Sequence, residues 1–190
     1  MLHQLSSILI RTSTGKVALL SVLVFLAFGA LVLPREAVRA ERVSGGAGSP
    51  DTTLLYSRDE LYTLAEEYGP VGRSAYVRAR YTFDIAFPLV YGFFLATTIS
   101  WFLAKVTGAG SRLRMINLIP VLGVLFDFLE NLSTSIVMLR YPQETDPVAA
   151  LAPIISLVKW IFVYGSFVVL GVLVLIWVIK RIKGVRTAPA

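Results

Sequence analysis

Four long apolar runs dominate the pattern of hydrophobic and polar positions along the chain. They cover about residues 17–33, 81–104, 115–139 and 153–179. Each has roughly the ~20 residues that a helix needs to cross the ~30 Å hydrocarbon core of a bilayer. None alternates apolar and polar residues as a barrel strand does. The pattern therefore predicts an all-α fold, a single membrane domain over residues 1–190 built as a bundle of four transmembrane helices.

The one sizeable polar region is the segment 35–80, between the first and second runs. Within it, Ser57 and Glu60 have the spacing of a capping box, which marks the start of a helix. Leu61 and Ala65 follow at helical spacing and place apolar side chains on one face. We expect a short amphipathic outer helix here, on the extracytoplasmic side of the membrane. At the other end of the molecule, residues 2–10 are expected to form an amphipathic helix on the cytoplasmic surface.

Two prolines affect the expected spans. Pro34 is expected to end the first span, and Pro88 is expected to kink the second. The first run also admits a second interpretation as a cleaved signal peptide, because Lys16 precedes it and small residues follow at 37–40. The run is longer than the usual apolar core of a signal peptide, which favours a retained span.

Basic and acidic residues lie in different connections. The N-terminal side, the loop between the second and third runs and the C-terminal tail carry nine basic residues and no acidic ones: Arg11, Lys16, Lys105, Arg112, Arg114, Lys180, Arg181, Lys183 and Arg186. Positively charged connections stay on the cytoplasmic side. We therefore expect an integral protein of the plasma (cytoplasmic) membrane with both termini in the cytoplasm. This distribution accounts for the net charge of +6 without a nucleic-acid partner.

The composition excludes several kinds of chemistry. The chain is 56% hydrophobic and 16% charged, and it has no cysteine, so disulfides, thiol catalysis and Cys-ligated metals are ruled out. The single histidine is His3, which leaves no basis for a Ser-His-Asp triad or a zinc-protease motif. We expect no metal and no cofactor, and the catalytic residues of any enzyme would be unknown.

Five polar residues lie inside the apolar runs, where they are costly: Asp84, Asp127, Glu130, Asn131 and Lys159. A charged group at mid-bilayer costs about 2.5–3.5 kcal/mol on insertion scales, so such groups face the bundle interior and pair. Asp127, Glu130 and Asn131 are spaced i, i+3 and i+4, which places them on one face of the third span. Counted along the helices, the whole set lies in the outer half of the bundle. It is the candidate site, either a ligand-binding cluster or an ion-pair cluster.

Two interpretations of these charges stay open. In the structural one, Lys159 pairs with Glu130 or Asp84, or Asp84 pairs with Arg80 one turn earlier, and the pairs fix the helix register. In the functional one, three acids facing one base leave an excess of carboxylates, which favours a polar cavity open to the outside. A further cluster, Arg73, Arg78 and Arg80, could contact a lipid phosphate, or could stabilise the outer helix against head groups.

The order of features resembles that of EXPERA-type four-helix membrane proteins. The parallels are the sequence Leu33-Pro34-Arg35-Glu36 after the first span, an extracytoplasmic segment, Asp84 just before Pro88, and a Pro120-containing third span with acids. The resemblance implies a lipid-accessible cavity lined by carboxylates that binds sterol-like or cationic amphiphilic ligands. The histidine of the isomerase branch and the acid of the first span have no counterpart here, so isomerase activity is not implied. The composition equally fits another family of small prokaryotic membrane proteins.

The leading functional interpretation is non-enzymatic. An outward-facing polar intramembrane cavity would bind a lipid or amphiphile, or the bundle would support a partner membrane protein. One alternative is a small proton-coupled transporter or channel subunit that uses Asp127 and Glu130 as a relay and works as an oligomer. Another is a lipid-modifying enzyme with carboxylates as acid and base. The expected partners are membrane lipids and either a membrane protein or further copies of this chain.

Overall fold

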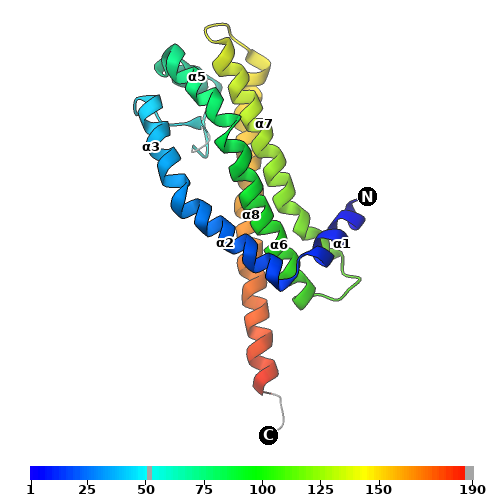
Figure 1. Ribbon diagram of the computed structural model, residues 1–190. Coiled ribbons are helices and arrows are strands. Elements are labelled where there is room, and N and C mark those ends of the chain that lie inside the picture. Colours follow the sequence, from blue (N-terminus) through cyan, green and yellow to red (C-terminus); the bar gives the residue numbers. More distant parts are fainter. Residues whose placement is uncertain (51–52, 187–190) are drawn as a thin grey trace.

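The computed structural model describes residues 1–50 and 53–186, and every regular element within these ranges is helical (Figure 1). In chain order the helices are α1 (Leu2–Thr12), α2 (Gly15–Leu31), α3 (Leu33–Ser44), α4 (Arg58–Glu67), α5 (Gly69–Arg80), α6 (Phe83–Val106), the 3-10 helix η2 (Arg112–Leu118), α7 (Ile119–Arg140) and α8 (Asp146–Arg186). Four stretches are long and apolar enough to cross a membrane: Gly15–Ser44, Gly69–Val106, Arg112–Arg140 and Asp146–Lys183. The prediction of an all-helical bundle with four membrane-spanning helices is confirmed.

Pro34 does not end the helical run, contrary to expectation. The break between α2 and α3 is confined to Val32, and Pro34 lies in the first turn of α3. A proline costs nothing there, because the first N–H groups of a helix have no partner within it. The charged residues after the first apolar run are therefore helical. The run ends instead at Gly45, which adopts the left-handed conformation (φ 63°) that glycine tolerates.

The capping box forms at the start of α4. The Ser57 hydroxyl accepts a hydrogen bond from the Glu60 N–H at 3.2 Å, and the Ser57 N–H donates to Glu60 Oε2 at 2.6 Å. Hydrogen bonding of the Glu60 carboxylate to the Ser57 backbone N–H, and to a smaller extent to the Ser57 side chain, holds the pKa of Glu60 below its ordinary value of 4.5. Leu61 and Ala65 point inward and are fully buried. The position of α4 relative to a membrane surface stays a prediction.

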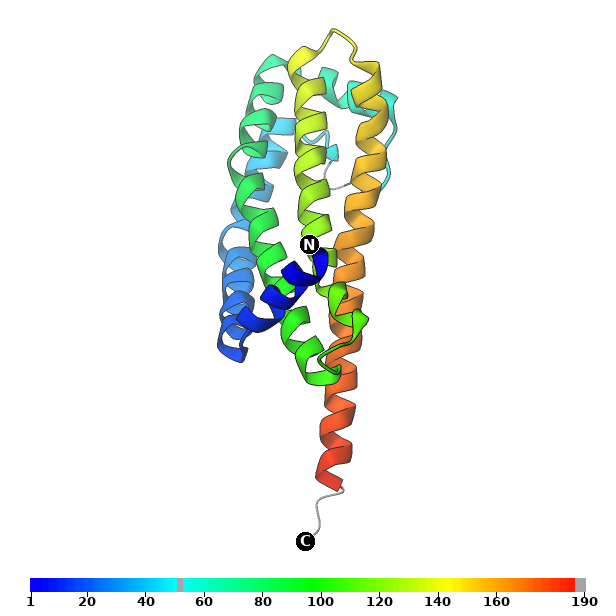
Figure 2. The same cartoon turned by 90° about the vertical axis from the view of Figure 1, so that its right-hand side faces the viewer.

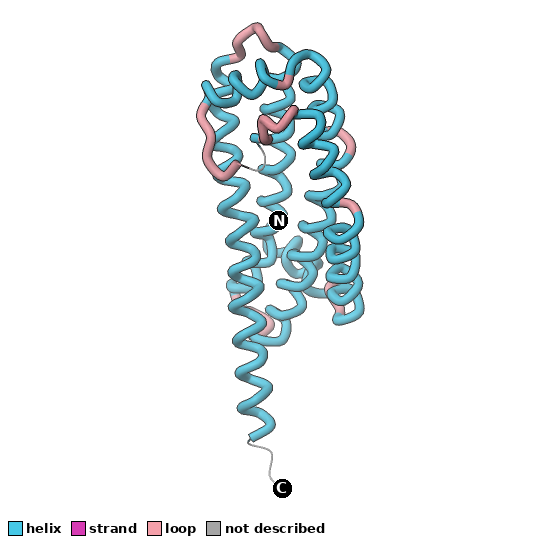
Figure 3. The backbone as a smooth tube through the Cα atoms, turned by 90° about the vertical axis from the view of Figure 1, so that its left-hand side faces the viewer, coloured by secondary structure: helices cyan, strands magenta, loops and turns pink. Residues whose placement is uncertain are grey.

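Helix α6 is central in the bundle and contacts α2, α7 and α8. Figures 1 and 2 show α2 and α3 along one side, and α8 continuing past the end of α6. Figure 3 shows loops at both ends of the bundle and others part-way along its sides. Helix α2 packs mainly on α6, where the hydroxyls of Ser21 and Thr97 are 2.7 Å apart. The helices run alternately up and down, so the start of α2 and the end of α8 lie toward the same end.

The closest packing is between α7 and its neighbours. Gly92 of α6 faces Val124, and a Cβ at Gly92 would clash with that side chain. Gly123 faces Val163, where a Cβ would come within 3.3 Å. Across the α7–α8 contact the buried α8 residues are mostly small: Ala149, Ala152, Ser156, Val163 and Ser166. Small residues let membrane helices approach closely and gain dispersion contacts.

The buried apolar residues form two clusters, named here from their places in Figure 1. The upper cluster joins α4, α5, α7 and α8 and consists of Tyr56, Leu61, Ala65, Tyr68, Tyr76, Val137, Met138, Ala149 and Ala152. The lower cluster joins α6 and α8 and consists of Tyr91, Phe94, Leu95, Ile99, Leu103, Val163 and Leu173. The upper cluster therefore packs the segment between the first two spans against α7 and α8.

The N-terminal helix α1 lies across the bundle rather than along it (Figure 2). Buried Ser6 fixes it, since its hydroxyl donates to the Arg114 carbonyl at 3.0 Å and its carbonyl accepts from Asn117 Nδ2 at 3.1 Å. Asn117 also donates to the Ser100 hydroxyl at 2.9 Å. The apolar side chains of Leu2 and Ile8 remain exposed, as in a helix that lies in a membrane interface.

Candidate functional site

The candidate site is a polar layer between the upper and lower clusters. On α8, Lys159 lies between Ala152 of the upper cluster and Val163 of the lower one. On α7, Glu130 lies about two turns from Val137 of the upper cluster. Charged groups between two apolar cores must be paired or hydrogen-bonded to offset the loss of hydration.

Glu130 and Lys159 form an ion pair across the α7–α8 contact. Lys159 Nζ lies 2.5 Å from Glu130 Oε2, and the two residues are 4% and 1% exposed, respectively. The ammonium group also lies 4.4 Å from the centre of the Trp160 ring, where a cation is attracted to the ring face. The structure thus gives Lys159 one of the two partners that the sequence suggested.

Asp84 is paired with Arg80 instead. Arg80 Nη2 lies 2.8 Å from Asp84 Oδ2 across the junction of α5 and α6, and both residues are 7% exposed. The Arg80 guanidinium stacks 4.5 Å from the Tyr76 ring centre. Tyr76 in turn donates its hydroxyl hydrogen to Thr134 of α7 at 3.1 Å. This ion pair therefore ties the break between α5 and α6 to α7.

Asp127 is held by hydrogen bonds to neutral groups. Tyr91 of α6 donates its hydroxyl hydrogen to Asp127 Oδ2 at 2.9 Å, and Asn131 Nδ2 lies 3.3 Å from Asp127 Oδ1. The same Asn131 nitrogen lies 3.3 Å from the Asp84 carbonyl. Asp127 is half-buried, whereas Asn131 is buried. Asn131 thus links the Asp127 carboxylate to the main chain of α6 at Asp84.

The charge balance of the layer differs from the expected one. Counting Arg80, three acids face two bases, and each base pairs with its own acid. The excess of carboxylates over bases is therefore one instead of two, which gives less support to a functional cavity. Tyr91 and Asn131 hold the carboxylate of Asp127 by hydrogen bonds.

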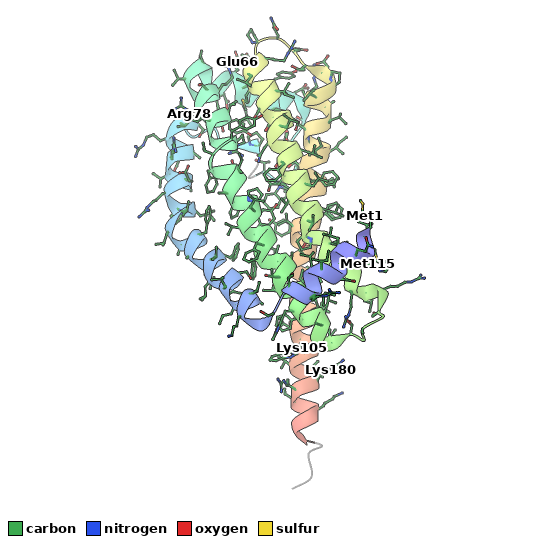
Figure 4. All side chains as sticks on the ribbon, turned by 45° about the vertical axis from the view of Figure 1, so that its right-hand side comes forward. Met1, Glu66, Arg78, Lys105, Met115 and Lys180 are labelled. Carbon is green, nitrogen blue, oxygen red and sulfur yellow. The ribbon has the colours of Figure 1, made fainter. Side chains whose placement is uncertain are left out.

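The three arginines suggested as phosphate contacts do not converge. Arg73 donates to the Ala65 carbonyl at 2.7 Å and stacks 4.8 Å from the Tyr141 ring centre. Arg80 is buried with Asp84. Arg78 is exposed (Figure 4). Contacts within the protein account for the positions of Arg73 and Arg80, and a phosphate contact stays a prediction.

A cavity of about 170 Å³ lies beside the polar layer, between α3 and α5. Its lining is mainly apolar, with Arg80 at its inner side: Leu33, Glu36, Ala37, Arg39, Ala40, Val43, Ser49, Tyr68, Ala75, Tyr76, Ala79, Arg80 and Phe83. Neither Asp127, Glu130 nor Lys159 lines it. This cavity differs in place and chemistry from the polar one expected among the second, third and fourth spans.

Two residues of the layer were not identified from the sequence. Tyr91 was missed as the partner of Asp127, and Tyr76 was missed as the platform for Arg80. A usable signal existed for Tyr91, which is seven residues after Asp84 and so lies on the same face of the second span. A signal existed for Tyr76 as well, because Tyr76 and Arg80 are four residues apart in α5, a spacing that places two side chains on the same face of a helix.

Comparisons with known proteins add no assignment. No protein-family model matches the chain, and no curated sequence or solved structure is significantly similar to it. The resemblance to EXPERA-type proteins stays a prediction. The chain is an all-helical integral membrane protein. It has a polar layer with two buried ion pairs and an adjacent, mainly apolar cavity.

Proposed function

We propose that this protein binds a lipid or another amphiphile in the cavity between α3 and α5. The observation that carries the proposal is the lining, which combines a hydrocarbon-like wall with a charged edge. Ala37, Ala75 and Ala79 supply small apolar surfaces, and Leu33 and Phe83 supply larger ones. An apolar cavity with a few placed polar groups is the usual form of a small-molecule site.

The charges around the cavity favour an anionic head group. Helices α3 and α5 together carry six arginines (Arg35, Arg39, Arg42, Arg73, Arg78 and Arg80) against two glutamates (Glu36 and Glu41). Arg39 lies at the cavity edge, 3.6 Å from Glu36 in an exposed pair that costs little to open. An arriving carboxylate or phosphate could therefore take Glu36's place beside Arg39.

The proposal places the cavity on the extracytoplasmic side of the plasma membrane. Its support is the charge distribution, since the opposite end carries nine basic residues and no acidic ones. Because the chain lacks cysteine, single cysteines can test this orientation. Gln143→Cys, in the α7–α8 connection, should react in intact cells with a membrane-impermeant maleimide, and Ser111→Cys should react only after lysis. The reverse pattern would overturn the orientation.

Filling the cavity tests the binding function. The purified protein in a neutral detergent would be titrated with palmitate, lysophosphatidylglycerol and dodecyltrimethylammonium while its thermal unfolding is followed. The two anionic probes should raise the unfolding temperature of the wild type saturably and more than the cationic probe does. Ala79→Trp, which occupies the cavity, should abolish that rise.

Ala86→Trp is the matched control, because Ala86 is exposed on the neighbouring helix. It should respond to the probes as the wild type does. Equal stabilisation of the wild type and Ala79→Trp, or no stabilisation of either, would overturn the proposal. If Ala79→Trp does not fold, Ala75→Leu offers a smaller obstruction of the same cavity.

A further inference from the structure

A second pocket lies at the opposite end of the bundle, where α8 passes the end of α6. It has a volume of about 200 Å³ and is lined by Lys105, Trp177, Lys180 and Arg181. Figure 4 shows Lys105 and Lys180 close together at this end, far from Glu66 and Arg78. Three of the four lining residues are cationic, so the pocket has the chemistry of an anion site.

Aromatic rings hold two of the cations in place. Lys105 Nζ lies 5.8 Å from the Trp101 ring centre, and the Arg181 guanidinium carbon lies 5.5 Å from the Trp177 ring centre. The two indole rings are themselves 6.0 Å apart. These contacts orient the charged groups without neutralising them.

The third cation is fixed by the backbone. Lys180 Nζ donates to the Val106 carbonyl at 2.9 Å, at the C-terminus of α6, where main-chain carbonyls lack partners within the helix. This bond uses one of the three hydrogens of the ammonium group. The other two remain available to an anion in the pocket.

No acid in the described part of the chain pairs with these three cations. The sequence explains this, since residues 1–35, 85–126 and 147–190 contain no aspartate or glutamate. Among the described residues, the α6–α8 end therefore concentrates positive charge without an acidic side chain to balance it. An anion bound among the three groups would offset the repulsion between them.

The surroundings identify the source of that anion as the membrane. On α8, the exposed apolar side chains of Ile176 and Val178 flank the pocket residue Trp177. Trp101 and Trp177 lie toward the C-terminal ends of α6 and α8. Near the end of a span, an indole ring favours the boundary between hydrocarbon and head groups. A phospholipid can place its acyl chains against the exposed side chain of Ile176 or Val178 and its phosphate among the cations.

We propose that Lys105, Lys180 and Arg181 form a binding site for the phosphate of an anionic phospholipid. The site is separate from the α3–α5 cavity and independent of its function. A phosphate would accept hydrogen bonds from the two lysines and from the arginine fork. Zwitterionic lipids bind more weakly, because their own ammonium group meets the three cations.

Brominated lipids test the site, because bromine quenches tryptophan fluorescence at short range and two of the chain's three tryptophans flank the pocket. The full chain would be reconstituted in vesicles that contain brominated phosphatidylglycerol or brominated phosphatidylcholine in an unlabelled background. The wild type should be quenched preferentially by phosphatidylglycerol. A variant with Lys105→Gln, Lys180→Gln and Arg181→Gln should lose this preference, on the order of a hundredfold in relative affinity at about fivefold per charge.

The matched control removes equal charge at the same end. A variant with Arg11→Gln, Lys16→Gln and Arg112→Gln should keep the preference, since these three residues are exposed and do not line the pocket. Loss of preference in both variants would mean general electrostatic attraction and would overturn a specific site, as would equal quenching of the wild type by both lipids. Displacement by millimolar inorganic phosphate would overturn the assignment to a lipid. Ala79→Trp should leave the preference unchanged, so this result is separable from that for the α3–α5 cavity.

Discussion

Glu130 of α7 and Lys159 of α8 form an ion pair at 2.5 Å, almost completely buried between two apolar clusters. Removing charges from water costs several kcal/mol per ion, and good geometry with further hydrogen bonds repays it. We infer that the pair contributes to specificity, because its geometry fits one register between α7 and α8. A slip of one residue along α8 would separate the two charges.

A double-mutant cycle tests this coupling. Glu130→Gln and Lys159→Met should each destabilise the protein by about 3–5 kcal/mol, because each leaves a buried charge without its partner. The double variant should be less destabilised than the sum of the two by more than ~1 kcal/mol. Unfolding in mixed micelles measures all four proteins. Strictly additive losses would show that the two charges do not stabilise each other.

The pair between Arg80 and Asp84 predicts different roles for two neighbouring arginines. Arg80→Met should destabilise the protein by about 3 kcal/mol, because it leaves Asp84 buried without its base. Arg78→Met removes the same charge from an exposed position of the same helix and should change stability by less than ~0.5 kcal/mol. The measurement is again unfolding in mixed micelles, and equal effects would refute the structural role of Arg80.

The close approach of α6 and α7 makes Gly92 sensitive to a single methyl group. Gly92→Ala should cost about 1–3 kcal/mol, because its Cβ would clash with the branched side chain of Val124. Gly165→Ala is the control. It lies in α8 with open space around its added Cβ, and alanine favours helix there. The control should therefore be neutral or stabilising, and an equal loss in both variants would contradict the packing described.

The hydrogen bonds of Asn117 predict local loosening of α1. Asn117→Leu removes the bonds to Ser6 and Ser100, so amide hydrogen exchange should speed up in residues 2–12 by about 5–10-fold, as expected for the loss of ~1 kcal/mol. Exchange in α7 and α8 should change little. Leu113→Ala, at an exposed position of η2, should leave α1 protection unaltered. Unchanged protection in Asn117→Leu would show that other contacts hold the helix.

The site was only partly predictable from the sequence. Helical spacing correctly grouped Asp127, Glu130 and Asn131, because a regular helix fixes which residues share a face. Their partners could not be assigned, because Glu130 at one edge of the stripe meets α8 while Asp127 meets α6. Which helix each side chain contacts depends on how three helices are rotated and offset relative to one another. The spacing of residues within one helix gives no information about this.

The sequence by itself determined the four membrane-spanning helices. In a bilayer each span must satisfy its own backbone hydrogen bonds and be apolar over ~20 residues, so local composition is sufficient. Only the tertiary structure decided that Pro34 begins a helix, that Arg80 neutralises Asp84 and that the cavity lies between α3 and α5. These features arise where helices meet, and contacts between distant segments depend on close packing of particular side chains.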